Sequence, residues 1–408
     1  MLKSFCTEKA YFFQIGMNKM SVIDRFLRYV EFETTSNENS ESIPSTEKQT
    51  VLADYLVKEL KSIGVSDAYR DKYGYVYGHI PATKGFEKLP KIGLISHMDT
   101  SPDVSGKDVK AKIIKFDGTN APMIDAKYSG EDIIVTDRTT LLGADDKAGV
   151  AEIIEACREI CDDAELCHGK ISICFTPDEE IGRGADKFDF ETFDADFACT
   201  VDGGELGGIE YENFNAAGAK ITFNGVNTHP GTAKNKMKNA VLYLAEFINM
   251  LPAAEAPAHT ENREGFYHVS SVNGNESKAT LHMIIRDHNK QSFTKRKEFI
   301  TVLVEFFNRK YGENTVSAEI KDSYYNMLDV IKEHIDIVER AKKAMRKAGV
   351  EPQITPIRGG TDGARLSFEG LPCPNLSTGG MNFHSIYEAI PVNAMLKMVE
   401  VIKNLVSE

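Results

Sequence analysis

The chain has 408 residues, 42% of them hydrophobic, which is enough for two domains with ordinary cores. Its formal net charge of −13 argues against nucleic acids and anionic membranes as partners, because both bind basic surfaces. No stretch approaches the roughly 18 consecutive apolar residues that a transmembrane helix requires. The seven cysteines include no Cys-x-x-Cys pair, so we predict reduced, structural thiols in a cytoplasmic protein.

The first 19 residues lack an uninterrupted apolar core and a small-residue cleavage site, so they make a poor signal peptide. We expect a disordered extension or a mis-assigned start there, followed by a helix that begins after Ser21. A second helix is predicted at Glu47–Ile63, where Thr46 and Gln49 have the spacing of a capping box. Strands and helices then alternate up to Val201, which predicts a mixed or largely parallel sheet covered by helices on both faces.

The pattern changes at about residue 219. From there the sequence predicts a strand at Lys220–Asn224, a helix at Lys236–Leu251, a hairpin of Phe266–Asn273 and Lys278–Arg286, a second helix at Thr294–Tyr311 and a final strand at Val316–Asp322. This order is that of the split βαβ, or ferredoxin-like, plan. We therefore predict an α+β domain at 219–322, inserted between two parts of an α/β domain at 20–218 and 323–408.

Five residues of metal-binding type each follow a short β-rich or turn segment: His97, Asp145, Glu180, Asp202 and His384. Ligands of open α/β sheets bind outside the carboxyl ends of the strands, so we expect these side chains to converge. Two histidines and three carboxylates suit zinc or its divalent relatives. Because carboxylates outnumber imidazoles, one carboxylate could bridge two ions, as in two-metal hydrolases. The order predicts a metallohydrolase.

Each motif taken alone has a simpler interpretation. His97 and Asp99 could be a turn histidine beside a solvated aspartate, although Asp99 could also fix the orientation of the ring. The Asp145–Lys147 tripeptide could be an acidic helix N-terminus. Glu179 and Glu180 could belong to a solvated loop, or one could hold metal while its neighbour acts as a base. Only the joint pattern favours the metal site.

The motifs resemble those of the co-catalytic zinc exopeptidases, which include carboxypeptidase G-type enzymes and aminoacylases. The resemblance rests on His97–Asp99, Gly143–Lys147, Pro177–Glu180 and Val201–Gly204. Longer stretches are similar to the peptidase T branch of tripeptide aminopeptidases: Ile95–Pro102, Thr140–Ala151, Phe175–Glu180, Thr200–Gly204, Glu212–Ala217, His229–Lys234 and Arg358–Ala364. The resemblance implies a mixed β-sheet sandwiched by helices, with the insertion serving as a lid.

The resemblance also implies two zinc ions per subunit, with cobalt or manganese as substitutes. The five ligands would form two pairs and a bridge: His97 with Asp202, Glu180 with His384, and Asp145 between the ions. Asp99 would orient His97, and Glu179 would be the general base. Asp145, rather than Asp146, aligns with the bridging position of the family, because Lys147 stands two residues after it. The resemblance also implies a cis peptide bond between Asp145 and Asp146.

The implied activity is hydrolysis of the N-terminal peptide bond of tripeptides by a monomer or a homodimer. His229 would stabilise the tetrahedral intermediate, although a histidine next to proline could simply belong to a turn. Arg286 and Arg358 are candidates for the substrate carboxylate, whereas their alternatives are a salt bridge with Asp287 and surface solvation, respectively. Hydrolysis of N-acyl amino acids or dipeptides is the alternative activity. A non-enzymatic binding module is disfavoured because the base and all five ligands are present.

Overall fold

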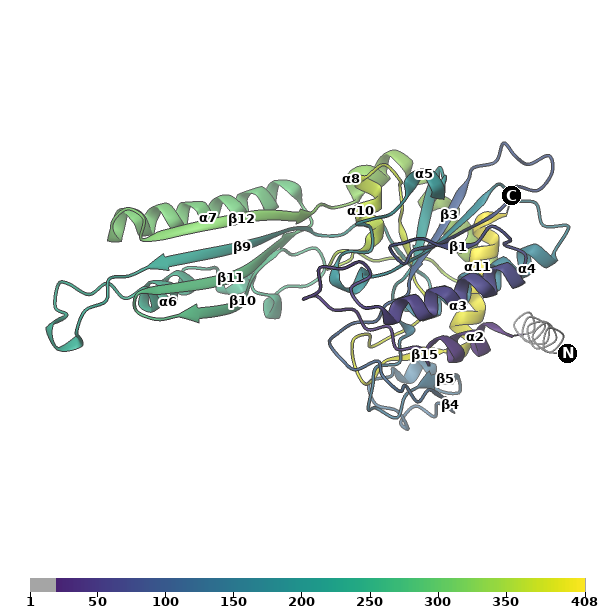
Figure 1. Ribbon diagram of the computed structural model, residues 1–408, viewed down its shortest axis with the longest axis horizontal. Helices are drawn as coiled ribbons and strands as arrows, with labels where there is room; N and C mark the ends of the chain where they lie inside the picture. The colour runs from purple at the N-terminus through teal and green to yellow at the C-terminus, as the bar shows by residue number, and fades with distance from the viewer. Residues whose placement is uncertain (1–19, 408) are drawn as a thin grey trace, which may run out of the picture. The chain divides into compact units, whose positions relative to one another are not determined.

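The computed structural model describes residues 20–407, and the chain divides into two compact units (Figure 1). Among the described residues, unit 1 comprises 20–211, 330–355 and 361–407, and unit 2 comprises Glu212–Asp329 and Pro356–Gly360. The expectations for the first 19 residues lie outside the described part of the chain. None of the helices in the described residues combines the length and the apolar character that a membrane span requires.

Unit 1 is built on a mixed eight-stranded sheet with the order β1-β2-β6-β3-β7-β14-β8-β13. Its strands are β1 Tyr69–Arg70, β2 Val76–Ile80, β3 Ile92–His97, β6 Ile171–Thr176, β7 Phe197–Val201, β8 Gly208–Glu210, β13 Gln353–Ile354 and β14 Asn375–Leu376. Strands β6, β3, β7 and β14 run parallel, while β2 and β8 pair antiparallel with their neighbours β6 and β14. The central strands are buried along their whole length, as expected of strands covered on both faces.

Helices cover both faces of this sheet, which confirms the predicted α/β class. On one face α4 packs on β3 and β7 and is flanked by α2 and α11, with α9 against α11 (Figure 1). On the other face α5 and α10 enclose an apolar cluster that includes Ile95 and Phe193. The helices are α2 Val22–Tyr29, α3 Lys48–Ser62, α4 Ala144–Asp162, α5 Phe190–Phe193, α8 Leu328–Ile331, α9 Ile335–Lys347, α10 Asp362–Phe368 and α11 Val392–Val406.

A three-stranded sheet of unit 1 lies beside the chain that carries His384. Its order is β15-β5-β4, with β4 at Lys112–Lys115, β5 at Asp132–Val135 and β15 at Ala389–Pro391. A small core of Phe116, Ile133 and Ala389, among others, holds it together. This sheet fixes the position of the chain directly after the His384 loop, because β15 pairs antiparallel with β5.

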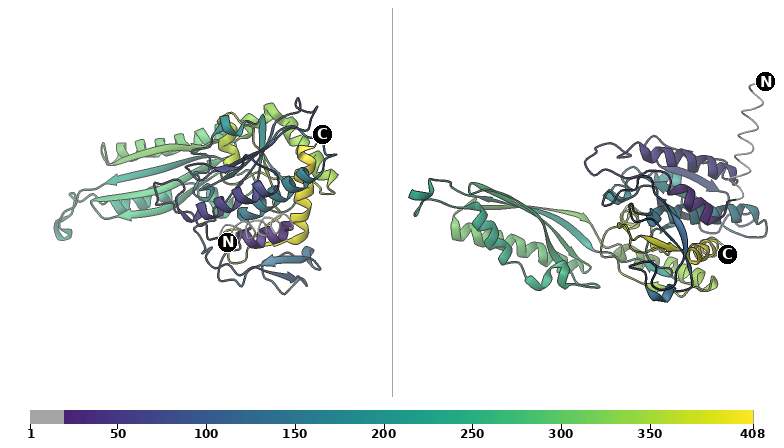
Figure 2. Two further views of the ribbon diagram at one scale, coloured as in Figure 1. Left: turned by 45° about the vertical axis from the view of Figure 1, so that its right-hand side comes forward. Right: turned by 90° about the horizontal axis from the view of Figure 1, so that it is seen from below.

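Unit 2 has the β-α-β-β-α-β order that the sequence predicts. Its elements are β9 Asn215–Asn224, α6 Ala240–Asn249, β10 Phe266–Gly274, β11 Lys278–Asp287, α7 Lys290–Tyr311 and β12 Val316–Tyr324. The antiparallel sheet has the order β10-β11-β9-β12, which is the ferredoxin-like arrangement. Both helices pack on one face (Figure 2), over a core that alternate residues of the strands supply.

The starts of α6 and α7 and the cap of α3 differ from the prediction. Helix α7 begins at Lys290, four residues before the predicted Thr294, with Asn289 as its N-cap. Helix α6 begins only at Ala240, because the side chain of Asn239 accepts hydrogen bonds from the first backbone amides. The capping box expected at Thr46 and Gln49 is wrong: Glu47 is the N-cap of α3 and makes no side-chain capping bond. The amide of Gln49 donates to Asp178 instead (2.7 Å).

Candidate metal centre

The candidate residues of unit 1 gather at the carboxyl ends of its parallel strands. His97 is the last residue of β3, Asp202 follows β7, and Glu180 lies in the short 3-10 turn that follows β6. Asp145 lies at the start of α4, which packs on β3 and β7. This is the edge at which open α/β sheets bind their ligands.

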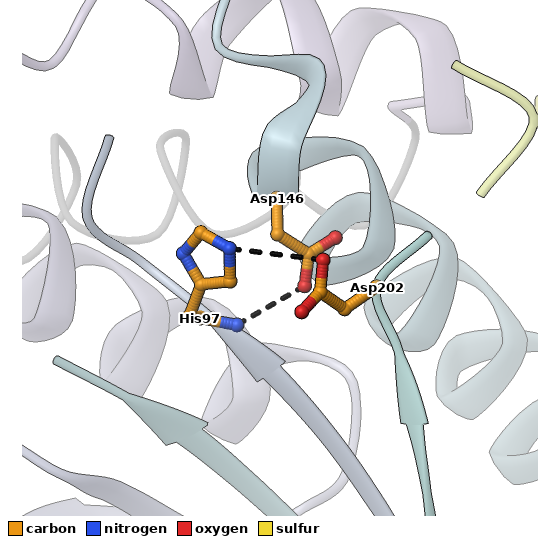
Figure 3. Close-up of side chains that lie close together, drawn as sticks. All are labelled: His97, Asp146 and Asp202. Carbon is orange, nitrogen blue, oxygen red and sulfur yellow. Dashed lines mark hydrogen bonds and ion pairs between the residues drawn. The ribbon is translucent and has the colours of Figure 1, made fainter. Parts of the chain in front are cut away.

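One ring nitrogen of His97 faces two carboxylates. Its Nε2 lies 2.9 Å from Oδ1 of Asp145 and 3.8 Å from Oδ1 of Asp202. Figure 3 shows the ring with the carboxylates of Asp146 and Asp202 beside it. The other ring nitrogen, Nδ1, lies 3.1 Å from the carbonyl oxygen of Asp99 and 3.3 Å from its Oδ1. Nε2 therefore points into the carboxylate cluster.

His384 approaches the same cluster from another loop. Its Nε2 lies 2.9 Å from Oε2 of Glu180 and 3.4 Å from Oδ2 of Asp145. Its Nδ1 is 3.3 Å from Oγ of Ser101 and 3.2 Å from a carboxylate oxygen of Asp103. Asp145 thus turns one carboxylate oxygen towards His97 and the other towards His384, so it lies between two donor sets.

Asp146 belongs to the same neighbourhood but has different partners. Its Oδ2 accepts the backbone N–H of His97 (3.1 Å), drawn in Figure 3, and its Oδ1 accepts the backbone N–H of Gly149 (3.2 Å). The oxygens of Asp145 instead face the two histidine rings. The Asp145–Asp146 peptide bond is cis, as the resemblance implied.

The carboxylates control the protonation of both histidines. Burial disfavours a charged ring at His97, but the carboxylates of Asp202, Asp145 and Asp99 outweigh burial and raise the pKa of His97 well above its ordinary value. Hydrogen bonds to Asp145 and Glu180 raise the pKa of His384 to about 11. Burial would raise the pKa of Asp145, but its bonds to the two histidines hold that pKa below its ordinary value.

The other acids of the cluster resist ionisation. Burial, together with neighbouring carboxylates, raises the pKa values of Glu179, Glu180 and Asp202. Oε1 of Glu180 is buried and has no hydrogen-bond partner among the described residues. Crowded, buried carboxylates beside two imidazoles are what a divalent cation would neutralise, so this donor set fits zinc-type ions. Donor atoms of His97, Asp145 and Glu180 lie within 4.8 Å of one another.

Asp99 has a wider role than the orientation of His97. Its side chain is fully buried. Its Oδ1 accepts the backbone N–H of Glu179 (3.0 Å), and its Oδ2 accepts that of Glu180 (3.2 Å). One carboxylate therefore lies against the His97 ring and also holds the turn that carries the two glutamates.

Sequence reasoning missed a second support of that turn. Asp178, fully buried, accepts the backbone N–H of Ser45 (2.7 Å), the Ser45 hydroxyl (2.5 Å) and the Gln49 amide. Its backbone is left-handed, with φ of 60°. Asp178 lies inside the Pro177–Glu180 motif, so the motif contained the residue but gave no indication of its distant partners.

Asp362 is another residue that the sequence analysis gave no role. It begins α10 and accepts a hydrogen bond from the Thr176 hydroxyl at the end of β6 (3.1 Å). Burial raises the pKa of Asp362 to about 7, and its charge in turn helps to raise the pKa of Glu179. The Arg358–Ala364 stretch includes Asp362, so a buried acid at a helix start was the available signal.

The three predicted substrate-binding residues lie in unit 2. His229 is in a loop, where its Nδ1 accepts the backbone N–H of Gly231 (3.1 Å). The guanidinium of Arg286 lies 4.8 Å from the ring centroid of Tyr324, and its buried Nη1 has no partner among the described residues. Arg358 donates to the backbone carbonyls of Thr260, Asn262 and Glu264 and to the Thr260 hydroxyl. The alternative interpretations of both arginines were wrong. Arg286 does not pair with Asp287, which bonds Arg296 instead, and Arg358 is bonded to protein oxygens rather than only to solvent.

Comparisons with known proteins agree with this architecture. Residues 211–315 match the model of the M20 peptidase dimerisation domain. A peptidase T of Halothermothrix orenii is 55% identical over 94% of this chain and 98% of the relative. The crystal structure of the aminopeptidase PepT from Bacillus cereus superposes with a TM-score of 0.77, at 25% identity over 94% of this chain and 97% of that chain.

A more distant structure shares the fold. It is the YXEP protein of Bacillus subtilis, described as a dinuclear metal binding peptidase of the M20 family, with a TM-score of 0.64 and 16% identity over 94% of this chain and 96% of that chain. The high identity to a peptidase T extends over nearly the whole chain, and the fold and motifs agree with it. The chain therefore belongs to the peptidase T family of M20 peptidases.

Proposed function

We propose that the protein is a metallo-aminopeptidase that hydrolyses the N-terminal peptide bond of tripeptides. The observation that carries the proposal is the position of Asp145, whose two carboxylate oxygens face two different histidines, His97 and His384. Membership of the peptidase T family supports the substrate class. The alternative substrates, N-acyl amino acids and dipeptides, are separated by the assay described below.

The metal ligands divide into two sets with one shared member. His97 and Asp202 would hold one ion, Glu180 and His384 the other, and Asp145 would bridge them. Two zinc ions, for which cobalt or manganese could substitute, would polarise the scissile carbonyl and lower the pKa of the attacking water. The distances support this division. His97 lies near Asp202 and His384 lies near Glu180, while Asp145 lies near both histidines.

Glu179 is the general base of the proposed reaction. It adjoins the ligand Glu180, and Asp99 holds the backbone amides of both residues. Burial and the carboxylates of Asp362 and Asp202 raise the pKa of Glu179, and the charge of bound cations would oppose this shift and favour the ionised form that accepts a proton. Its carboxylate takes a proton from the attacking water and then protonates the leaving amine.

Unit 2 supplies the substrate contacts. Arg286 binds the C-terminal carboxylate of the tripeptide, a role supported by its Nη1, which has no hydrogen-bond partner within residues 20–407. Arg358 supports the site indirectly, because its donors already hold the loop from Thr260 to Glu264. His229 stabilises the tetrahedral intermediate when unit 2 closes over the peptide as a lid. Of the two oligomeric states considered, the match to a dimerisation domain favours the homodimer.

The location that we propose is the cytoplasm. The six cysteines among the described residues are all free thiols, which is typical of a reducing compartment.

A peptide panel tests the activity and the substrate class. The protein would be assayed on one tripeptide with free ends, its N-acetyl and C-amide derivatives, and the corresponding di- and tetrapeptide, with zinc and with a chelator. We expect the free tripeptide to be cleaved fastest, at its first bond, with loss of activity in the chelator and recovery on adding zinc. Preferential cleavage of the acetylated peptide or the dipeptide would replace this proposal by the amidohydrolase alternative.

A further inference from the structure

Three backbone N–H groups converge on the carboxylate of Glu388. Those of Leu142 and Gly143 donate to Oε2 (2.7 and 3.0 Å), and that of Asp145 donates to Oε1 (3.0 Å). The residue is 2% exposed. Three hydrogen bonds to one buried side chain hold the Leu142–Asp145 backbone in place.

The Leu142–Asp145 segment needs such a contact because the start of α4 is irregular. The N-cap, Gly143, has φ of +83° and makes no side-chain capping bond. Asp145 and Asp146 have non-helical dihedral angles, with φ −87° and ψ 104° at Asp145. The first amides of a helix have no partner within it. The helix alone therefore does not fix the orientation of Asp145. Glu388 satisfies the amide of Asp145 and also those of Leu142 and Gly143, which come just before the helix.

Glu388 itself is held by the loop that carries His384. The two ends of this loop are joined by a pair of backbone hydrogen bonds. The N–H of Met381 donates to the carbonyl oxygen of Ala389 (2.9 Å), and the N–H of Ala389 donates to that of Met381 (3.1 Å). Within it, the Ser385 hydroxyl donates to the carbonyl oxygen of Asn382 (2.6 Å). Directly after Glu388, β15 pairs with β5. Glu388 thus connects a fixed His384 loop to the Asp145 segment.

We propose that Glu388 is a positioning residue that sets the location of Asp145 relative to His384 and thereby the affinity of both metal sites. It is not one of the proposed ligands, and both of its oxygens accept hydrogen bonds from backbone amides. The inference rests on the proposed two-metal function. It predicts that loss of Glu388 weakens both sites together, since Asp145 is shared between them.

The test compares Glu388→Gln with a matched variant, Glu59→Gln. Glutamine can present its oxygen to Leu142 and Gly143, but its NH2 group then opposes the N–H of Asp145. Glu59 is also fully buried and bonds Arg25 (2.9 Å) and the Tyr29 hydroxyl (2.6 Å), none of which is a proposed ligand. Metal-free proteins would be titrated with Zn²⁺ against a chromophoric chelator, at a temperature at which circular dichroism shows them folded.

We expect Glu388→Gln to bind both Zn²⁺ ions about 10–100-fold more weakly, the usual effect of removing a residue that orients a ligand. The visible spectrum of its Co²⁺-loaded form should also change, because the coordination geometry shifts. Glu59→Gln should lower the midpoint of thermal unfolding while it leaves the Zn²⁺ affinity and the Co²⁺ spectrum unchanged.

Glu388→Asp keeps the charge but shortens the side chain, and it replaces the glutamine variant if that one does not fold. A folded variant of Glu388 with wild-type Zn²⁺ affinity and Co²⁺ spectrum would overturn the inference and leave Glu388 a purely structural residue. Failure of the proposed function is distinguishable: it would appear in the wild type, as absence of two-ion binding or of tripeptide cleavage.

Discussion

The backbone N–H of Glu179 donates to Oδ1 of Asp99 at 3.0 Å, and the same oxygen lies 3.3 Å from Nδ1 of His97. Glu179 and Asp99 are 80 positions apart in the chain. The proposed base and a proposed ligand are therefore fixed by one buried carboxylate. A displacement of Asp99 would move both at once, which couples the position of the base to that of the ion held by His97.

Replacing Asp99 by alanine should reduce Zn²⁺ affinity about 10–100-fold, as is typical when the partner of a ligating histidine is removed. The turnover number at saturating metal should fall as well, because the Glu179 turn loses its anchor. Metal titration and kinetics at several Zn²⁺ concentrations would separate the two effects. Full recovery of turnover in excess metal would show that Asp99 serves His97 alone.

Glu179→Gln should keep a normal metal content and lose most of its turnover. A general acid–base group contributes roughly two to four decades of rate, and Glu179 acts on the only nucleophile of the proposed reaction. Elemental analysis combined with kinetics checks this. Glu180→Gln serves as the comparison and should lose metal instead. The opposite pattern in the two variants would exchange their roles.

Asp145→Ala should lower the occupancy of both metal sites, whereas Asp202→Ala should chiefly empty one. The reason is that removing a shared carboxylate leaves two cations facing each other without the charge between them. Metal content after dialysis against a weak chelator is the measurement. If each variant lost a single ion, the assignment of Asp145 as the bridge would fail.

His229→Ala should lower the turnover number far more than it raises the Michaelis constant, because the proposed contact forms mainly in the transition state. Loss of one such donor typically costs about two to three decades of rate. Steady-state kinetics on the preferred tripeptide tests this. Normal turnover with weaker binding would make His229 a ground-state contact.

Zn²⁺ affinity should rise with pH through the neutral range. The pKa of His384, raised to about 11 by its carboxylate partners, keeps this ring protonated at pH 7 before a metal binds. A histidine must lose its proton to become a ligand, so binding releases protons. Calorimetry in buffers of different ionisation enthalpy counts the protons released. Affinity that does not vary with pH would remove His384 from the ligand set.

The sequence predicted the architecture well because its signals are local. Alternating strands and helices gave the α/β unit, and the β-α-β-β-α-β order gave unit 2. One wrong alternative could have been avoided by the same local reasoning. Arg286 and Asp287 are neighbours on β11 and so point to opposite faces. Accordingly Asp287 pairs with Arg296 (2.7 Å), while Arg286 lies over Tyr324.

The supports of the candidate centre were beyond prediction because they join distant segments. Gln49 has the spacing of a capping residue, yet it bonds Asp178, which is 129 positions away. Glu388 reaches amides 243 to 246 positions away. No periodicity or spacing in one sequence encodes such a pairing. The residue types of the motifs could be predicted, whereas the contacts that hold them in place could not.

The interrupted course of unit 1 has a consequence for the timing of folding. His384 and Glu388 are translated roughly 180 residues after Asp202, a delay on the order of ten to forty seconds at typical synthesis rates of about 5–20 residues per second. Until then the nascent chain carries the acidic cluster without its second histidine and without the contact at Leu142–Asp145. The proposed metal centre can therefore be completed only after the segment that carries His384 and Glu388 has been synthesised.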